Sequence, residues 1–245
     1  MSRGKTALVT GAAVRIGAVT VRQLHARGCD VLVHCNSRRQ EAEKLAAELN
    51  TERVDSAFVA QADLSTPRGV DALAGACRET FGQLDILVNN ASRFYPTDVG
   101  QTLAWQWDDL INSNLRGPYF LVSALLDELK TRGGSVINIV DIHAERPMSG
   151  HGVYCISKAG LAMMTRALAS ELAPAVRVNG VSPGAILWPE QEWDEAHRES
   201  ILGRVPLGRT GEAEDIASAV AYLALDAPYV TGQILAVDGG RSLTV

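Results

Sequence analysis

Residues 5–17 read KTALVTGAAVRIG, and they join a short apolar run to a glycine turn and an amphipathic stretch. The apolar run Lys5–Thr10 has the composition of a buried strand. The stretch Arg15–Arg27 places apolar residues at helical spacing. A glycine turn between a strand and a helix is typical of the first β-α unit of a doubly wound sheet. This segment therefore predicts an α/β fold with a parallel sheet.

The same alternation of strand and helix continues to the end of the chain. Alternating strands and helices predict a parallel sheet covered on both faces, here a single-domain Rossmann-type doubly wound sheet of about seven strands over residues 1–245. The later strands are expected at Val31–Cys35, Val54–Gln61, Leu84–Asn89, Ser135–Val140, Val176–Val181 and Gln233–Val237. The later helices are expected at Glu41–Asn50, Pro67–Phe81, about Leu103 to Lys130, Gly152–Ala173 and Glu212–Leu225.

One stretch, from Ala185 to about Thr210, breaks this pattern. It is rich in Trp, Pro and Glu and too polar to be core, so we interpret it as a flap over a site. Trp188 and Trp193 are equally suited to line the site or to contact another subunit.

The composition narrows the functional classes. The 245 residues carry a net charge of −5, which gives no electrostatic reason to expect nucleic acid as a partner. No apolar run reaches about 18 residues, so no membrane helix is expected. Strand-like sequence begins within about five residues of the start, which leaves no room for a signal peptide. The four cysteines form no CxxC pair or Cys/His cluster, which favours reduced thiols, a cytoplasmic location and no metal site.

The glycine turn is a candidate nucleotide site. Gly11 and Gly17 flank Ala12-Ala13-Val14-Arg15-Ile16, and such a turn lets the backbone approach a pyrophosphate while the helix start supplies N–H groups. A cation at a helix start opposes the helix dipole, so the guanidinium of Arg15 indicates a bound anion nearby. Gly11, Arg15, Ile16 and Gly17 are therefore candidate cofactor-binding residues.

The end of the second strand indicates NADPH rather than NADH. NADH-binding proteins place an acid there for the ribose 2′-hydroxyl, whereas this chain has Asn36, Ser37, Arg38 and Arg39. A hydroxyl and guanidinium groups suit a 2′-phosphate. The other interpretation is that the two arginines are only surface side chains at the start of a helix and bind no ligand.

Two further loops complete the candidate cofactor site. Asp63, followed by Leu64, comes after the third strand and is placed to meet the adenine. The fourth strand is followed by the run Asn89, Asn90, Ala91 and Ser92. We expect Asn89 to bridge loops structurally and the residues from Asn90 to Ser92 to contact the cofactor.

Tyr154 and Lys158 are the candidate catalytic pair. They lie four residues apart, which puts both side chains on one helical face. A neighbouring ammonium is expected to stabilise the phenolate and to lower the pKa of the tyrosine from about 10. The lysine can also bind the nicotinamide ribose.

Over nearly its whole length the chain resembles the short-chain dehydrogenase/reductase family. The resemblance implies that Asn114 helps to hold a water chain to the lysine and that Pro183 and Gly184 pass close to the nicotinamide. It also implies a homotetramer built through the helix at 152–173 and the last strand and helix. The matching pieces are TGAAVRIG at 10–17, NNAS at 89–92, Asn114, Tyr154/Lys158, Ser182-Pro183-Gly184 and Val237-Asp238-Gly239-Gly240.

The chain departs from the common family pattern twice. Arg15 replaces the middle glycine of the turn, and Asp141 stands where the catalytic serine usually follows the fifth strand. An ionised carboxylate cannot donate a hydrogen bond to a ketone and would repel a developing alkoxide. Asp141 therefore argues against ordinary ketone chemistry and favours sharing a proton with Tyr154 or binding an N–H-rich substrate.

Both departures, together with NNASRFYPT, resemble the pteridine reductases, a group within that family. The resemblance implies that a pterin stacks between Phe94 and the nicotinamide, and that Arg15 and Ser92 touch the pterin and the phosphates. A flat heteroaromatic ring gains about 1 kcal/mol from such stacking. The other interpretation of Phe94 is plain core packing. The residues that match this group are Arg15, Ser92, Phe94, Asp141, Tyr154 and Lys158.

The sequence thus predicts an NADPH-dependent pteridine reductase. The expected reaction is hydride transfer to a C=N bond of a dihydropterin, dihydrofolate or oxidised pterin, with Tyr154 supplying the proton with help from Asp141 and Lys158. One alternative is another short-chain reductase acting on a carbonyl or 3-oxoacyl substrate. A second is a non-catalytic NADP-binding sensor.

Overall fold

The computed structural model describes residues 4–186, 199–200 and 202–244, and within them seven strands form one sheet. All six neighbouring strand pairs are parallel, in the order β3-β2-β1-β4-β5-β6-β7. This confirms the predicted α/β fold with a parallel sheet. The strands are β1 (Thr6–Val9), β2 (Asp30–Cys35), β3 (Ala57–Gln61), β4 (Ile86–Asn89), β5 (Ser135–Ile139), β6 (Arg177–Pro183) and β7 (Ile234–Val237).

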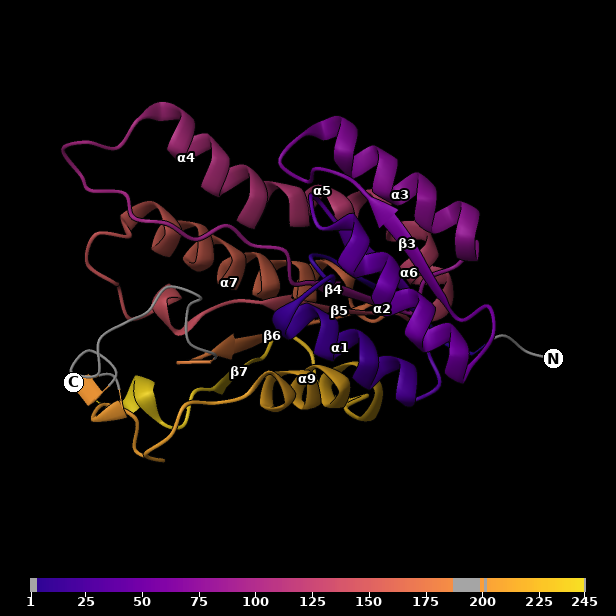
Figure 1. The fold of residues 1–245 in the computed structure, drawn as a ribbon. Coiled ribbons are helices and arrows are strands. Elements are labelled where there is room, and N and C mark those ends of the chain that lie inside the picture. Colours follow the sequence, from indigo (N-terminus) through magenta and orange to yellow (C-terminus); the bar gives the residue numbers. More distant parts are fainter. Residues whose placement is uncertain (1–3, 187–198, 201, 245) are drawn as a thin grey trace.

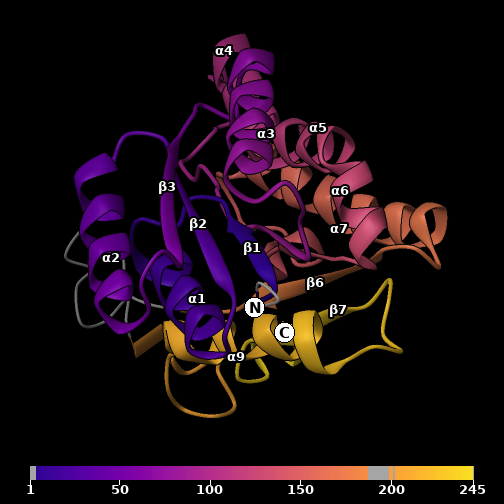
Figure 2. The ribbon, with the colours of Figure 1, turned by 90° about the vertical axis from the view of Figure 1, so that its right-hand side faces the viewer.

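Helices cover both faces of the sheet (Figures 1 and 2). One face carries α1 (Arg15–Ala26), α2 (Arg39–Glu52) and α9 (Ala213–Ala221). The opposite face carries α3 (Pro67–Phe81), α4 (Ala104–Ile111), α5 (Gly117–Ala124), α6 (Leu126–Arg132) and α7 (Gly152–Leu172). None of the helices in the described ranges is long and apolar enough to cross a membrane.

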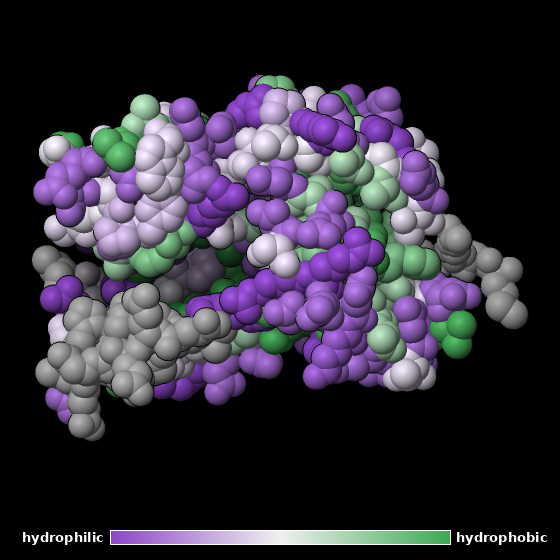
Figure 3. Space-filling view, turned by 45° about the horizontal axis from the view of Figure 1, so that its top comes forward, coloured by the Kyte–Doolittle hydropathy of each residue, from purple (hydrophilic) through white to green (hydrophobic). Residues whose placement is uncertain are grey.

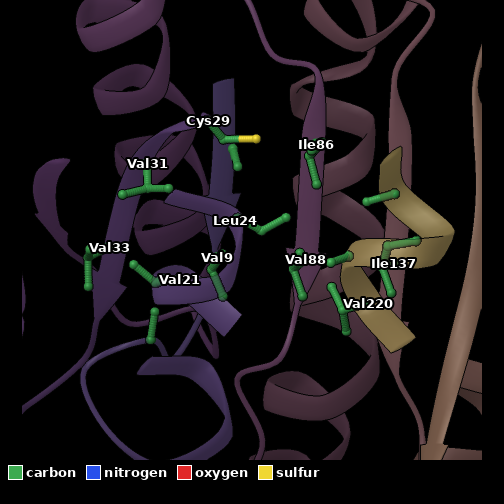
Figure 4. Close-up of a cluster of buried hydrophobic side chains, with 14 of the residues drawn as sticks. Val9, Val21, Leu24, Cys29, Val31, Val33, Ile86, Val88, Ile137 and Val220 are labelled. Atoms are coloured by element: carbon green, nitrogen blue, oxygen red, sulfur yellow. The ribbon is translucent and has the colours of Figure 1, made fainter. Parts of the chain in front are cut away.

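Alternate strand residues build the core on each side of the sheet. Val9 and Val88 point toward α1 and α9, whereas Leu8 and Leu87 belong to the cluster under α3, α5, α6 and α7. Figure 4 shows the first cluster, in which side chains of α1 and α9 lie with those of β1, β2, β4 and β5. All four of these strand side chains are fully buried, and each such burial stabilises the fold by about 1.5–3 kcal/mol. The central strands are therefore rigid supports for the loops at their carboxyl ends.

The predicted helical region from Leu103 to Lys130 is divided into four segments. Between α4 and α5 lies a π-helical stretch, Asn112–Arg116. Gly117 follows it at a point where a Cβ atom would lie 2.5 Å from the carbonyl oxygen of Leu64. Only a glycine lets the helix approach the loop after β3 so closely, and π-helical turns occur frequently at functional sites.

The predicted flap at 185–210 is described only in part. Residues 187–198 and 201, including Trp188 and Trp193, lie outside the described residues. At the flanks, Ile186 forms a β-bridge with Gly211, and Val205 is buried. The expectation that the whole stretch is too polar to be core is therefore wrong at Val205, which packs closely against the backbone at Gly239.

The strand order places the switch point between β1 and β4, because the chain winds outward in opposite directions from these two neighbours. Ligands of doubly wound proteins bind outside the carboxyl ends of the strands at such a point. The loops after β1, β2, β4 and β5 carry most of the residues that the sequence singles out.

Candidate active site

The glycine turn is held against the loop that follows β4. Gly11 has a φ of +61°, and a Cβ atom there would lie 2.8 Å from the Cα atom of Ala91. A Cβ on Gly17 would lie 2.4 Å from the carbonyl oxygen of Gly11. Both positions thus require glycine, and together they bring the start of α1 close to the backbone of two loops. A cradle of this shape fits a pyrophosphate group.

Arg15 adopts the left-handed backbone conformation, with a φ of +55°. This conformation costs a residue with a Cβ atom about 1–2 kcal/mol. The side chain is exposed, and no partner for its guanidinium is found among the described residues. A strained cation at a helix start, directly beside the glycine cradle, is what an anion-binding role requires.

His34 fastens the glycine turn to the sheet, a role that sequence reasoning missed. Its Nδ1 accepts a hydrogen bond from the amide of Gly11 at 3.0 Å, and its Nε2 bonds the carbonyl oxygen of Ala62 at 3.0 Å. Donation from Nε2 assigns the neutral tautomer. Burial lowers the pKa of His34 to about 4, so the ring stays neutral and keeps its acceptor at physiological pH.

The residues predicted to meet a 2′-phosphate follow β2 at the surface. Asn36, Ser37 and Arg38 are exposed, and Arg38 directly precedes α2. The guanidinium of Arg39 pairs with Glu43 one turn along the helix, at 2.7 Å. Arg39 therefore fits the interpretation as a surface side chain at a helix start. Asn36, Ser37 and Arg38 follow the carboxyl end of β2, as a 2′-phosphate site requires.

Two asparagines follow β4 and have different surroundings. Asn89 is buried and donates to the side chain of Asn138 on β5 at 2.8 Å. The amide nitrogen of Asn90 donates to the carbonyl oxygens of Thr10 and Gly11, at 2.8 and 2.9 Å. The side-chain nitrogen of Asn90 therefore holds the glycine turn, and its side-chain oxygen is the group that remains for a cofactor.

Arg93 joins the loops after β3 and β4, and nothing in the sequence pattern points to this role. Its guanidinium lies 3.6 Å from Asp63 and forms an ion pair with Asp109 of α4. Asp109 also accepts a hydrogen bond from Tyr95 at 2.9 Å. Asp63 itself is capped by the amide and hydroxyl of Ser65. The candidate adenine residue is thus tied to the loop that carries Phe94.

Asn114 lies in the π-helical stretch and is fully buried. Its side chain accepts from the amide of Arg93 and donates to the Ser157 hydroxyl of α7, at 2.8 and 3.0 Å. Ser92 donates to it at 3.2 Å. The side chain of Asn114 therefore links the loop after β4 to α7. Pro118, four residues later, has no N–H for the Asn114 carbonyl, and the water-binding role implied by resemblance stays a prediction.

Tyr154 and Asp141 form the centre of the site. The tyrosine hydroxyl donates to the Asp141 carboxylate at 2.7 Å, and the other carboxylate oxygen accepts from the backbone amide of His143 at 2.8 Å. Burial, followed by the charge of Asp141, raises the pKa of Tyr154 well above its usual value. The expected lowering of this pKa by Lys158 is wrong, because desolvation and the Asp141 carboxylate raise it.

Lys158 is buried on the same face of α7. Its Nζ donates to the backbone carbonyl of Ile139 at 2.9 Å and lies 5.8 Å from the centroid of the Tyr154 ring. Burial lowers the pKa of Lys158 to about 8. The pair predicted from its spacing of four residues is thus brought together, with the ammonium held by the end of β5.

Phe94 borders the Asp141–Tyr154 pair rather than filling the core. Its ring is 52% exposed and packs edge-on against Tyr154 at a centroid distance of 4.8 Å. His151, which sequence reasoning missed, stacks on it at 4.7 Å. The core-packing interpretation of Phe94 is therefore wrong. Figure 3 shows that the molecular surface is hollowed beside the region of α4.

The remaining predicted residues lie near the carboxyl ends of the strands. Pro183 ends β6, and Gly184 donates its amide to Val237 at 3.1 Å. A Cβ on Gly184 would lie 2.6 Å from Asp238, so glycine is required there. Leu64 and Ile16 support the loops from below, the first buried and the second packed against the core.

Comparison with known proteins agrees with this geometry. A family model described as "Enoyl-(Acyl carrier protein) reductase" matches residues 11–242. The doubly wound fold, the glycine turn and the Tyr154/Lys158 pair together define a short-chain reductase. The chain belongs to the short-chain dehydrogenase/reductase family.

Its relatives within that family act on different substrates. Pteridine reductase 1 of Leishmania tarentolae is 37% identical, over 97% of this chain and 96% of that protein. The 3-oxoacyl-[acyl-carrier-protein] reductase FabG of Pseudomonas aeruginosa is 38% identical over 99% of each. The 3beta-hydroxysteroid dehydrogenase 1 of Eggerthella lenta is 36% identical, over 98% of this chain and 95% of that protein. These relatives support an oxidoreductase, and their overall identity does not distinguish between the substrates.

Proposed function

We propose that this protein is an NADPH-dependent pteridine reductase. The observation that carries the proposal is the hydrogen bond from Tyr154 to Asp141, with the exposed ring of Phe94 packed against the same tyrosine. A carboxylate in this place suits a substrate rich in N–H groups, and an exposed aromatic ring suits a flat heterocycle.

The residues of the cleft fit NADPH. The cradle at Gly11 and Gly17 admits a pyrophosphate, because a Cβ atom at either position would collide with the backbone. Ser37 and Arg38 would hold the 2′-phosphate, and no acid stands at the end of β2 to favour NADH. NADPH supplies the hydride of the reaction when it is bound.

The protein's own groups supply and hold the proton. The raised pKa of Tyr154 keeps its hydroxyl protonated before the reaction, so the proton for a ring nitrogen is present. Giving up that proton requires stabilisation of the phenolate. Asp141 orients that hydroxyl and can accept from N–H groups of the substrate. Lys158, fixed by the carbonyl of Ile139, places a positive charge beside the phenol when the tyrosine has given up its proton.

Phe94 and Arg15 would hold the substrate ring. Phe94 offers a face for offset stacking, and His151 lies against its ring. Arg15 and Ser92 would reach the pterin and the phosphates. Dihydropterins, dihydrofolate and oxidised pterins all carry the C=N bond that such a site reduces.

A steady-state assay of NADPH oxidation tests the proposal. Wild-type protein is expected to turn over dihydrobiopterin, whereas Tyr154→Phe loses at least a hundredfold in kcat because the donated proton is gone. Asp141→Ser is expected to lose pterin activity as well. Retention of full pterin activity by Asp141→Ser would contradict the role given to the carboxylate.

Reduction of a 3-oxoacyl thioester is the second candidate, because the Pseudomonas aeruginosa relative is as similar as the pteridine reductase. The carboxylate of Asp141 argues against it, since it lacks the hydrogen that polarises a ketone. The same assay with acetoacetyl thioester separates the two candidates. A kcat/KM for the thioester above that for every pterin would favour the second.

The quaternary state and location belong to the same proposal. We expect each chain to form a single domain and four chains to form a homotetramer. We expect the enzyme to act in the cytoplasm. The four cysteines are free and buried, as is usual in a reducing compartment.

A further inference from the structure

A basic pocket opens at Ile142 and His143, the two residues that follow Asp141 in the chain. Its volume is about 280 Å³. Among the residues that the structure describes, the lining contains three arginines and no acidic side chain. It is formed by Ile142, His143, Arg146, Pro147, Arg204, Arg241 and Thr244.

The three guanidinium groups have no acidic partner among the residues that the structure describes. Within the described ranges, none of Arg146, Arg204 and Arg241 forms a side-chain ion pair or hydrogen bond, whereas Arg209 nearby in sequence pairs with Asp215 at 3.2 Å. Unpaired cations grouped around a concave surface repel one another, so an anion between them relieves that repulsion.

The nearest carboxylates are already engaged elsewhere. Asp141 accepts from Tyr154 and from a backbone amide. Asp238 accepts from the amides of Gly240 and Ser242, at 2.9 and 2.7 Å. Arg241 is half-buried, and its burial together with the charge of Arg204 lowers its pKa, although the two aspartates act in the opposite direction. Because its described lining holds three arginines and neither of these aspartates, the pocket itself is basic.

We propose that this pocket binds the anionic tail of the substrate, a carboxylate or a phosphate ester attached to the reduced ring. This inference rests on the proposed pteridine reductase function. Ile142 and His143 directly follow Asp141 in the chain, so a substituent on a ring bound at Asp141 would extend toward the arginines. Arginine recognises carboxylates and phosphates in a bidentate manner, which makes both tails suitable ligands.

The size of the pocket agrees with a tail rather than with a whole substrate. Sites for complete drug-sized ligands measure about 300–1,000 Å³, and this pocket lies below that range. A glutamyl group or a phosphate is small enough to occupy it while the ring remains between Phe94 and the cofactor.

Substrates that share one ring but differ in their tails test the proposal. We would measure kcat/KM for dihydrobiopterin, for dihydrofolate and for dihydroneopterin monophosphate. At least one anionic substrate is expected to exceed the neutral one about tenfold at low salt. Raising the salt from about 50 to 300 mM should reduce that ratio, because salt screens charges at a partly open site. The substrate that gains more distinguishes the glutamyl from the phosphate tail.

Variants of the pocket provide the control. Arg204→Gln with Arg241→Gln should bring the ratio close to one, whereas Arg68→Gln, an exposed arginine on α3, should leave it unchanged. Equal kcat/KM for neutral and anionic substrates in the wild type, or a ratio unaffected by the double variant, would overturn the proposal.

A binding measurement separates failure of this inference from failure of the proposed function. Calorimetry with p-aminobenzoylglutamate, and with inorganic phosphate in the presence of saturating NADPH, should give binding that the double variant loses. Binding without turnover of any pterin would contradict the proposed function and support an anion site. Turnover of pterins without either kind of binding and without tail preference would reject the anion site alone.

Discussion

At the scale of single residues, Arg15 combines backbone strain with a charge that has no partner in the described part of the chain. The family pattern has glycine at this point of the turn, and the φ of +55° is the conformation that glycine adopts without strain. A residue that keeps a Cβ atom there is retained for its side chain and not for stability.

Two substitutions separate the strain from the charge. Arg15→Gly and Arg15→Ala both remove the guanidinium, and both are expected to lower kcat/KM for a pterin at least tenfold. Arg15→Gly should unfold with a free energy about 1 kcal/mol higher than Arg15→Ala, because alanine keeps the steric cost of positive φ. Urea denaturation measures the difference. Equal stability of the two variants would show that the turn carries no strain at this position.

Burial of Lys158 makes the free energy of unfolding depend on pH. Its pKa is about 8 in the fold and 10.5 in an unfolded chain, so folding disfavours its ammonium form. This cost is complete below pH 8 and fades as the pH rises toward 10.5. Relative to Lys158→Met, the wild type should therefore gain about 2 kcal/mol in unfolding free energy between pH 7 and 9.5. Parallel pH profiles from urea unfolding of the two proteins would contradict the depressed pKa.

At the scale of secondary-structure elements, His34 connects the ends of β1, β2 and β3. Its neutral ring accepts from the turn after β1 and donates to the residue after β3. A protonated ring has no acceptor for the amide of Gly11. The geometry of the cradle is therefore coupled to the protonation state of one buried side chain.

Acid should loosen this connection. The pKa of His34 is about 4 in the fold against 6.5 when unfolded, so the stability it supports is complete above pH 6.5 and is lost as the pH falls toward 4. Between pH 7 and 5 the wild type should lose about 2 kcal/mol more than His34→Asn, which keeps an acceptor but does not titrate. Chemical denaturation at the two pH values measures this, and identical losses would refute the assignment.

The sequence predicts the elements well because strands and helices depend on local patterns. The strand expected at Gln233–Val237 begins one residue later in the structure, and α3 has the predicted bounds of Pro67–Phe81. The region between Leu103 and Lys130 was harder, because its π-helical turn depends on contact with the loop after β3.

The site was predictable where chemistry follows a motif, as for Asp141 and Tyr154. The roles of His34, Arg93 and His151 were not predictable, because each depends on a partner distant in sequence or on a stacking contact that no spacing rule encodes. The wrong direction for the pKa of Tyr154 has the same origin, since burial cannot be read from the spacing of two residues.

At the scale of the whole molecule, apolar side chains are exposed on α7 and β7, through which the resemblance implies assembly, and also on α4. Met163 of α7 is 60% exposed, and Trp107 of α4 and Leu235 of the edge strand β7 are also exposed. Large apolar groups on adjoining helices and on an unpaired sheet edge are typical of subunit contacts.

We expect a homotetramer in sedimentation analysis. Met163→Glu or Leu235→Glu should shift the protein to smaller species, because each places a charge in a dry contact. Val54→Glu, at an exposed position outside both surfaces, is the matched control and should sediment like the wild type. A monomeric wild type at working concentration would refute the prediction.

The ring of His34 also limits how the coenzyme preference can be redesigned. Transplanting the acidic β2 terminus of an NADH-dependent enzyme is a natural way to exchange one dinucleotide for the other. In this protein such a graft has to begin after residue 34, because that imidazole holds the candidate pyrophosphate loop although it lies in the second strand. A graft that replaced it would damage the recognition of both coenzymes and so obscure any change in selectivity.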